Sequence, residues 1–366
     1  MTRVTESKEK VKNVFCAIDV HQESMLAGIA LDRGKPSFMN CDTDEDGMFQ
    51  LVEYLIDLAG RHPGSEIRVV YEASGCGFRL ADLLIDHGIW AAVLSPTHLP
   101  QTVKTRKNKT DKNDCIRLLD MIRSHVLAGA ELPAVWIPPA QVRDDREIVR
   151  RRLSLKERGA DVKNAILGLL RRYGIKKPDD FKNNWTKKHV AWLKSLVKEL
   201  DHGAGVQLDS LLRELEFFDG ECERMDQEVD ALGSEDRYRD KREALIQIKG
   251  VSDLTAMVFL TELGDLSRFS NRRQLGNYLG LTPRVWESGE QNDRKGKISK
   301  MGPARVRKVL NQAAWSAVLW SPYWRDWFDE RAPKDKKTNK RKYGKKFIVA
   351  VMRKLGIEMW HVALAA

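Results

Sequence analysis

The chain has 366 residues, 42% of them hydrophobic, and its 63 Lys and Arg against 52 Asp and Glu give a formal charge of +11. This length predicts two or three domains, and the hydrophobic fraction excludes a globally disordered chain. The positive charge favours a polyanionic partner.

Cysteine usage and hydropathy exclude several other classes. The five cysteines are scattered without a C-x-x-C pair, which predicts reduced thiols and no structural zinc. The N-terminus has no apolar signal-like segment, and no run of about 18 apolar residues occurs. We therefore expect a cytoplasmic protein that does not enter a membrane.

The first third of the chain alternates strand-like and helix-like patterns. Apolar, β-prone runs predict strands over 14–20, 25–31, 67–71 and 89–94. Apolar residues at helical spacing predict helices over 46–59, 78–87 and 111–125. This order predicts a mixed sheet with helices on its faces, in an α/β domain that closes near residue 138.

Four acids lie in or beside these elements: Asp19, Glu72, Asp111 and Asp114. An ionised Asp19 in a buried strand needs a cation or strong donors. Asp111 and Asp114, three apart at a helix start, could instead be ordinary first-turn acids. If all four converge, each close pair repels by roughly 4 kcal/mol at an effective dielectric near 20. We therefore predict a divalent-cation site, for Mg²⁺ or alternatively Mn²⁺, that acts on a phosphodiester.

Two neighbouring features carry smaller expectations. His21 shares the strand face of Asp19, so it is either a proton-transfer group or a structural hydrogen-bond partner. The basic loop before the last helix is expected to grip phosphate, or else to be a solvated charge run; its cations are Lys104, Arg106, Lys107 and Lys109.

The middle segment, residues 139–242, has a different pattern. Apolar side chains are spaced alternately three and four apart at Leu208, Leu211, Leu215, Phe218, Cys222, Met225, Val229 and Leu232. A weaker heptad runs from 148 to 169. Such spacing predicts a coiled coil, formed either as a hairpin within one chain or as a seam between chains.

The last segment, residues 243–366, is predicted to be α-helical. A helix, a glycine turn and a second helix near Lys249 and Gly250 suggest a helix-hairpin-helix-like segment whose amides face phosphate. Residues 280–302 are rich in glycine and cations, and the candidates for nucleic-acid contacts there are Arg294, Lys295, Lys297 and Lys300.

Several motifs together resemble one family. Ala17-Ile-Asp19-Val-His, Tyr71-Glu72-Ala-Ser-Gly-Cys-Gly and Lys109-Thr-Asp111-Lys-Asn-Asp114 are similar to the D, E, D and D motifs of DEDD transposases of the "one-ten" family of bacterial insertion sequences. The similarity continues through Ile248-Lys-Gly250-Val, Leu279-Gly-Leu-Thr-Pro283-Arg and Gly296-Lys-Ile-Ser299-Lys-Met-Gly302.

The resemblance implies three regions. Residues 1–138 would form a ribonuclease-H-like, Holliday-junction-resolvase-like catalytic domain whose four acids hold the metal. Residues 139–242 would form a coiled-coil or helical linker, and residues 243–366 a C-terminal transposase domain.

The resemblance also implies an activity. The chain would be a DNA transposase or recombinase that cuts and rejoins double-stranded donor and target DNA, guided by a structured non-coding RNA. A serine would form a covalent link to the DNA; by the resemblance it falls at Ser288, with Ser299 as the competing candidate. We expect a homodimer or homotetramer.

Two alternatives stay open from the residues alone. One is a metal-dependent nuclease or junction resolvase that uses activated water. The other is a non-catalytic RNA-binding scaffold with a structural ion.

Overall fold

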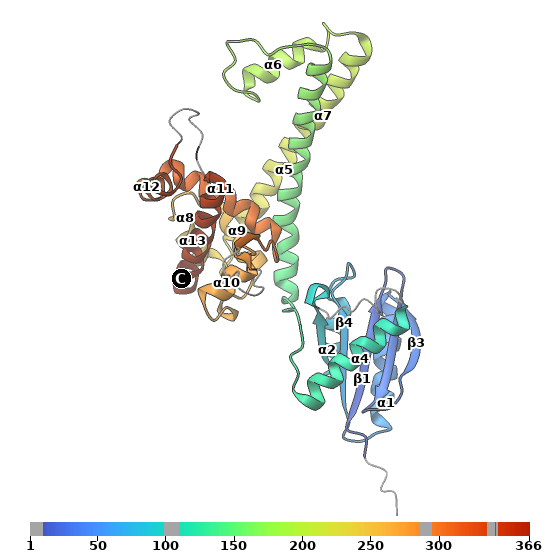
Figure 1. Ribbon diagram of the computed structural model, residues 1–366. Coiled ribbons are helices and arrows are strands. Elements are labelled where there is room, and N and C mark those ends of the chain that lie inside the picture. The colour runs from blue at the N-terminus through green and yellow to red at the C-terminus, as the bar shows by residue number, and fades with distance from the viewer. Residues whose placement is uncertain (1–9, 99–109, 286–294, 335–340, 342) are drawn as a thin grey trace, which may run out of the picture. The chain divides into compact units, whose positions relative to one another are not determined.

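The computed structural model describes residues 10–98, 110–285, 295–334, 341 and 343–366. The chain divides into two compact units, Met1–Ile137 and Pro138–Ala366, whose elements are labelled in Figure 1. Within the described residues, every helix is too short or too polar to cross a membrane.

The first unit is built on a five-stranded mixed sheet in the order β3-β2-β1-β4-β5. Its strands are β1 (Asn13–Val20), β2 (Ser24–Leu31), β3 (Ser37–Asp42), β4 (Glu66–Glu72) and β5 (Trp90–Leu94). β1 pairs antiparallel with β2 and parallel with β4, and β5 is parallel to β4. The mixed sheet with flanking helices is as predicted, but the edge strand β3 was not.

Helices cover both faces of this sheet. They are α1 (Glu45–Gly60), α2 (Arg79–Asp86) and α4 (Asp111–Ala128), with a short 3₁₀ turn η1 (Pro96–His98) after β5. Alternate residues of β1 point to opposite faces. Phe15 and Ala17 pack with Leu118 and Leu119 of α4, while Cys16 packs with Leu55 of α1. Odd-numbered residues of β1 therefore face α4.

Gly28 in β2 lets α4 approach the sheet closely. A Cβ at Gly28 would lie 3.1 Å from the Cβ of Cys115, and the Cys115 thiol donates to the Leu26 carbonyl at 3.1 Å. Both contacts lie beside Asp114, so they help to determine where the first turn of α4 meets the sheet.

The second unit begins with two long helices, α5 (Ala140–Arg172) and α7 (His202–Gly233), joined through α6 (Lys187–Leu196). Arg152 donates to both oxygens of Asp226 at 2.7 and 2.8 Å, and Lys163 pairs with Asp219 at 3.7 Å. Numbers rise along α5 as they fall along α7, so the pair is an antiparallel hairpin within one chain. A coiled-coil supertwist in this hairpin stays a prediction.

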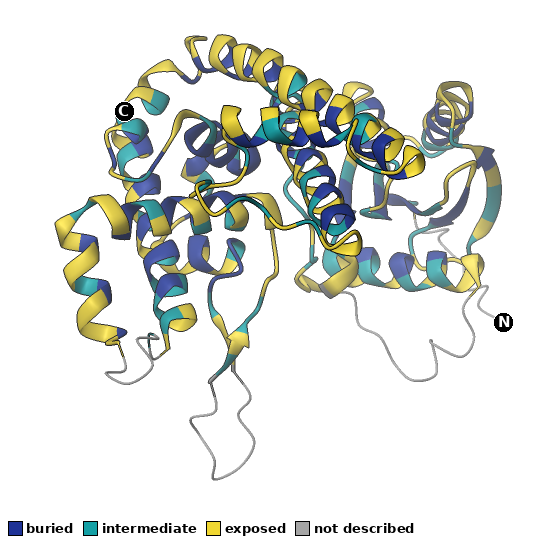
Figure 2. Ribbon diagram, turned by 90° about the horizontal axis from the view of Figure 1, so that it is seen from above, coloured by how far each residue is buried: buried dark blue, intermediate teal, exposed yellow. Residues whose placement is uncertain are grey.

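The remaining helices of this unit share one core with the start of α5 and the end of α7. They are α8 (Arg239–Ile246), α9 (Asp253–Leu263), α10 (Arg272–Tyr278), α11 (Ala304–Trp320), α12 (Pro322–Arg331) and α13 (Gly344–Ala365), with a 3₁₀ turn η2 (Leu266–Arg268) and a small hairpin of β6 (Pro283–Val285) and β7 (Lys295–Ile298). Figure 2 shows buried and exposed residues alternating along the helices of the protein, as expected of amphipathic packing. The β6–β7 hairpin was not predicted.

A buried ionic cluster ties α5 to the helices that follow. Asp145 accepts a hydrogen bond from the Nη2 atom of Arg237 at 2.8 Å and another from the Tyr238 hydroxyl at 2.7 Å. Arg150 contacts both oxygens of Glu262 in α9 at 2.7 and 3.0 Å. Removing one partner of a buried ion pair is strongly destabilising, because the other charge is left without compensation. This cluster therefore makes the start of α5 part of the same folded unit as the helices that follow.

Candidate active site

The register of the central strands brings two of the predicted acids side by side. Ile18 pairs with Tyr71 across parallel β1 and β4, so Asp19 and Glu72, one residue further, lie near the carboxyl ends of neighbouring strands at the same edge. Both continue the alternation of Ala17 and Val70, which face α4. The two carboxylates therefore share the carboxyl edge and the face of the sheet that α4 covers.

The first turn of α4 supplies the other two acids. The Thr110 side chain caps the helix by accepting from the Asn113 amide, so Asp111 and Asp114 are first-turn residues. Negative charge in this turn suits the helix dipole. The capping explanation of these acids is thus correct locally, and it is compatible with a role in a shared site.

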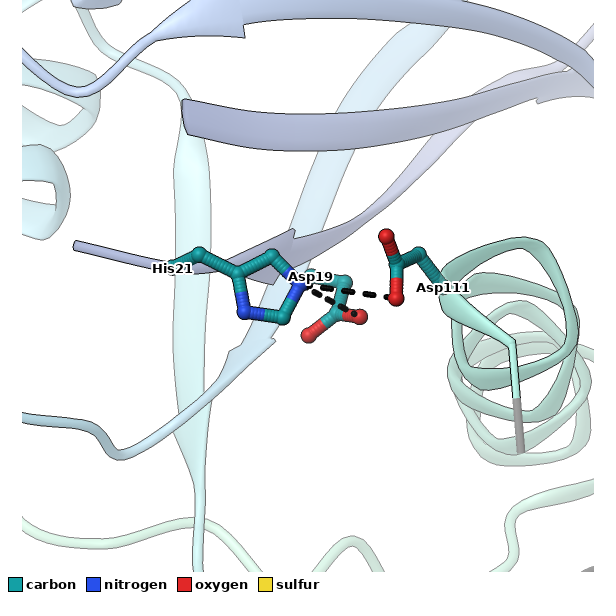
Figure 3. A group of neighbouring side chains, drawn as sticks. All are labelled: Asp19, His21 and Asp111. Atoms are coloured by element: carbon teal, nitrogen blue, oxygen red, sulfur yellow. Dashed lines mark ion pairs between the residues drawn. The ribbon is translucent and has the colours of Figure 1, made fainter. Parts of the chain in front are cut away.

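Asp19, His21 and Asp111 form one close group. The Nε2 atom of His21 lies 3.4 Å from Oδ2 of Asp19 and 3.5 Å from Oδ1 of Asp111. Figure 3 shows the imidazole approaching both carboxylates, one from the end of β1 and one from the start of α4. The Cys76 thiol, in the turn after β4, donates to the His21 carbonyl at 3.2 Å. This turn therefore helps to hold the segment that carries His21.

Glu72 and Asp114 form a second pair joined by Arg117. The Nη2 atom of Arg117 donates to Oε1 of Glu72 at 2.5 Å and lies 3.5 Å from Oδ1 of Asp114. Sequence reasoning missed this arginine. The spacing of Asp114 and Arg117, three apart on one helix, was the available signal.

The donor set of the first group fits a divalent cation. One ligand atom each from Asp19, His21 and Asp111 lies within 4.8 Å of the others. Carboxylate oxygens suit Mg²⁺ and Mn²⁺, and imidazole nitrogen suits the transition metal better. Asp19 is about four-fifths covered whereas Asp111 is exposed, so the group opens to solvent on the α4 side.

Burial beside these acids suppresses ionisation of a neighbouring thiol. The pKa of Cys115 is raised to about 11, chiefly by burial and further by the charges of Asp19 and Asp114. Cys115 is therefore a neutral packing residue beside the acids, with no role as a thiolate ligand at neutral pH.

Half of the ten predicted nucleic-acid contacts lie in described parts of the chain. Lys249, Lys297 and Lys300 have exposed side chains. Lys295 begins β7. Outside the described residues lie Ser288, Lys104, Arg106, Lys107, Lys109 and Arg294. Ser299 follows β7, and its amide donates to the Thr282 carbonyl at 2.8 Å.

Gly250 has a packing role that the sequence did not indicate. Its φ is +97°, and an added Cβ would lie 2.5 Å from the Ala313 carbonyl oxygen in α11. Only glycine fits here without a shift of the backbone. A contact with phosphate at Gly250 stays a prediction.

The fold and the site define a class. A mixed sheet with flanking helices, carrying acids at the carboxyl edge of its parallel strands, together with a helical C-terminal region, is compatible with a ribonuclease-H-like DEDD transposase.

Comparisons with known proteins agree with this class. A family model of DEDD transposases, described as "Transposase", matches residues 16–175, and the model "Transposase IS116/IS110/IS902 family" matches residues 242–329. The chain belongs to this family of DNA transposases of insertion sequences.

Three relatives illustrate the similarity. Two transposases named y4qE and y4rJ of Sinorhizobium fredii are 30% and 29% identical, over 67% and 80% of this chain and 57% and 76% of their own lengths. The transposase for insertion sequence element IS1533 of Leptospira borgpetersenii is 25% identical over 83% of this chain and 85% of its own. The alignment with y4qE thus spans little more than half of that relative.

Proposed function

We propose that this transposase cuts and rejoins double-stranded donor and target DNA at a divalent-metal site held by Asp19, Glu72, Asp111 and Asp114. The observation that carries the proposal is the meeting of Asp19 and Asp111 around His21, with Glu72 beside Asp19 in the strand register. Acids from two strands and one helix converge there although they are far apart in sequence.

Mg²⁺, or Mn²⁺ in its place, would supply a Lewis acid that offsets the charge of the phosphate. The chain's own residues have separate roles. The carboxylates hold the cation, and His21, within ion-pair reach of two of them, can hold or pass a proton at Nε2.

The nucleophile in this proposal is Ser288, which would form a covalent phosphoserine link to one DNA strand. A serine hydroxyl is a weak nucleophile until a base or a metal activates it. Cations in the same part of the chain, such as Lys297 and Lys300, are exposed and suited to the phosphate backbone.

We propose further that a structured non-coding RNA, encoded with the element, directs the choice of DNA, and that a homodimer or homotetramer acts. The net charge of +11 supports binding of two polyanions. In this proposal the α5–α7 hairpin is the strut that pairs protomers.

The test uses the full chain, DNA with the element's native flanks, and RNA transcribed from those flanks. With Mg²⁺ present, we expect a protein–DNA adduct that survives denaturation. Ser288→Ala is expected to abolish the adduct with DNA binding intact, whereas Ser299→Ala keeps it. Asp19→Asn is expected to lower cleavage at least about a hundredfold.

Other results would select another function. Cleavage without an adduct, unchanged in Ser288→Ala, identifies a nuclease or junction resolvase that uses water. If strand exchange is unchanged in the Asp19→Asn and Glu72→Gln variants, the proposed metal-dependent mechanism is wrong. RNA binding without any strand exchange leaves the scaffold alternative.

A further inference from the structure

A pocket of about 420 Å³ lies in the second unit, where α5 ends and the chain continues toward α6 (Figure 1). Pockets of roughly 300–1,000 Å³ are the usual size for small ligands. Leu170 and Ile175 form part of its apolar lining, and the four acids of the first unit are not among its residues. The pocket is therefore separate from the proposed metal site.

His189 lines this pocket and is fully buried. The rings of Phe181, Trp185 and Trp192 pack against its imidazole, with centroids 6.1, 5.5 and 5.4 Å away. Its Nδ1 atom accepts from the Trp185 amide at 3.2 Å, so the neutral ring carries its proton on Nε2. Burial and the charge of Lys177 lower the pKa of His189, which keeps the ring neutral at pH 7.

The Nε2 atom of His189 is a donor without an acceptor. It is buried, and it has no hydrogen-bond partner among the described residues. A buried N–H group that stays unpaired costs about 1–3 kcal/mol. A ligand that brings an acceptor to His189 would satisfy this group, so the pocket favours ligands with ring nitrogens or carbonyl oxygens.

Three cations line the same pocket: Arg171, Lys176 and Lys177. None of the lining residues, all of which the structure describes, is acidic. Between residues 171 and 188 the chain has seven cations and two acids, and one of these acids, Asp180, pairs with Lys188 at 2.5 Å. The pocket cations are therefore in excess over nearby acids, and they favour an anionic ligand.

The ligand that matches these walls has an anionic end, a hydrogen-bond acceptor and a flat apolar face. A nucleotide has all three, because its phosphate is anionic and its base combines a flat ring with acceptor atoms. Inorganic phosphate lacks the flat face, and a nucleoside lacks the charge. Arginine suits the phosphate in particular, since its guanidinium can contact two phosphate oxygens at once.

We propose that this pocket binds one nucleotide. The base lies on Leu170 and Ile175 and accepts from Nε2 of His189, while the phosphate contacts the three cations. The nucleotide is either free or an unpaired unit of a nucleic-acid strand, because both present the same chemistry to the pocket. The inference goes beyond the proposed function, since it involves neither the acids nor the candidate serines.

The experiment measures binding of 5-iodouridine 5′-monophosphate to the full chain by calorimetry. Inorganic phosphate and the nucleoside 5-iodouridine serve as partial ligands. We expect the nucleotide to bind at least about tenfold more tightly than either, because only the nucleotide makes both sets of contacts. Ultraviolet light crosslinks the iodinated base to aromatic side chains, and mass spectrometry should place the crosslink of the nucleotide within residues 171–192.

Three variants test the contacts. Arg171→Gln is expected to weaken nucleotide binding about tenfold, through loss of one charge-assisted contact, and to leave nucleoside binding unchanged. His189→Phe keeps an aromatic ring but removes the donor, so nucleotide and nucleoside binding should weaken by the same factor. Lys187→Gln is the matched control: Lys187 is an exposed cation at the start of α6 that does not line the pocket, and its loss should change neither affinity.

Thermal melting of each variant checks folding. If His189→Phe melts lower than the wild type, Arg171→Gln decides the test, because Arg171 is exposed. A short unpaired strand that carries 5-iodouridine distinguishes the two sources. If this strand crosslinks within residues 171–192, the occupant is a unit of a strand; if only the mononucleotide does, the occupant is a free nucleotide.

Three results would overturn the inference: nucleotide affinity no higher than that of inorganic phosphate, equal nucleotide affinity in Arg171→Gln and the wild type, or a mononucleotide crosslink only outside residues 171–192. The proposed function is tested separately by adduct formation and by the Asp19→Asn variant. Either proposal can therefore fail while the other stands.

Discussion

Cys16 lies at the centre of β1 with no exposed surface. Its pKa is raised well above its ordinary value of 9.0, first by burial and then by the neighbouring thiols Cys115 and Cys41. The thiol therefore stays neutral in the folded chain at alkaline pH, where the same thiol in the unfolded chain ionises.

This difference predicts a loss of stability at alkaline pH. A folded-state pKa above the unfolded value contributes stability that is complete below about pH 9 and declines above it, by at most about 1.4 kcal/mol per pH unit. In Cys16→Ala, the decline between pH 9 and 10.5 should be smaller. Urea denaturation of the full chain, with proteolysis reporting on the first unit, measures it.

Cys76→Ala is the control for this prediction, because Cys76 is partly exposed, unlike Cys16. Equal alkaline slopes in Cys16→Ala and the wild type would contradict the explanation.

At single positions, the chemistry of a residue predicted that it belongs to the candidate site, but it did not predict which residues it contacts there. A carboxylate in an apolar strand identified Asp19, and the face shared with His21 followed from strand periodicity. The contact of Arg117 with Glu72 joins residues 45 positions apart. Such a contact depends on which helix covers which strand end, so a local pattern could not predict it.

Helix α4 is the element on which the site depends, and Gly28 determines how closely it packs. A β-branched side chain at Gly28 would meet Cys115 and Leu119, whose nearest atoms lie 3.1 and 3.4 Å from an added Cβ. Since α4 is packed against β1, β2 and β4, overpacking here is expected to move its first turn, which carries Asp111 and Asp114.

Gly28→Val should therefore lower the stability of the first unit by about 1–3 kcal/mol and weaken metal binding in the folded fraction. Gly60→Ala is the matched control, because no atom lies within 4 Å of an added Cβ at the end of α1. Denaturation and Mn²⁺ titration together measure the effect. Metal binding equal to the wild type in folded Gly28→Val would show that α4 does not position the acids.

The elements that the sequence missed are those with weak patterns. β3 has one buried residue, Cys41, because it is an edge strand, so its alternation of polar and apolar residues is faint. β6 and β7 are three and four residues long, too short for any periodicity. In α7, Leu212 is more buried than Leu211, since a hairpin partner selects the packed side within one turn.

At the scale of the whole molecule, the acids and the C-terminal cations belong to different compact units. Metal binding should stabilise the unit that holds the acids. Calorimetric melting of the full chain is expected to show two transitions. A divalent ion at about 100 times its Kd should raise the stability of the first unit by about 2.7 kcal/mol and leave the second unchanged.

Asp19→Asn combined with Asp111→Asn is the control, and the metal-induced shift should disappear in it. A shift confined to the second unit would place the metal site elsewhere and contradict the assignment.

The sequence by itself determined the family and the alternation of strands and helices in the first unit, and it predicted the four acids of the proposed metal site. These depend on side-chain chemistry and on periodicities of a few residues, which are local. Only the tertiary structure decided that Asp19 joins Asp111 through His21, that Arg117 lies between Glu72 and Asp114, and that Gly250 packs on α11. Those contacts arise from strand register and helix packing, which bring together residues tens of positions apart.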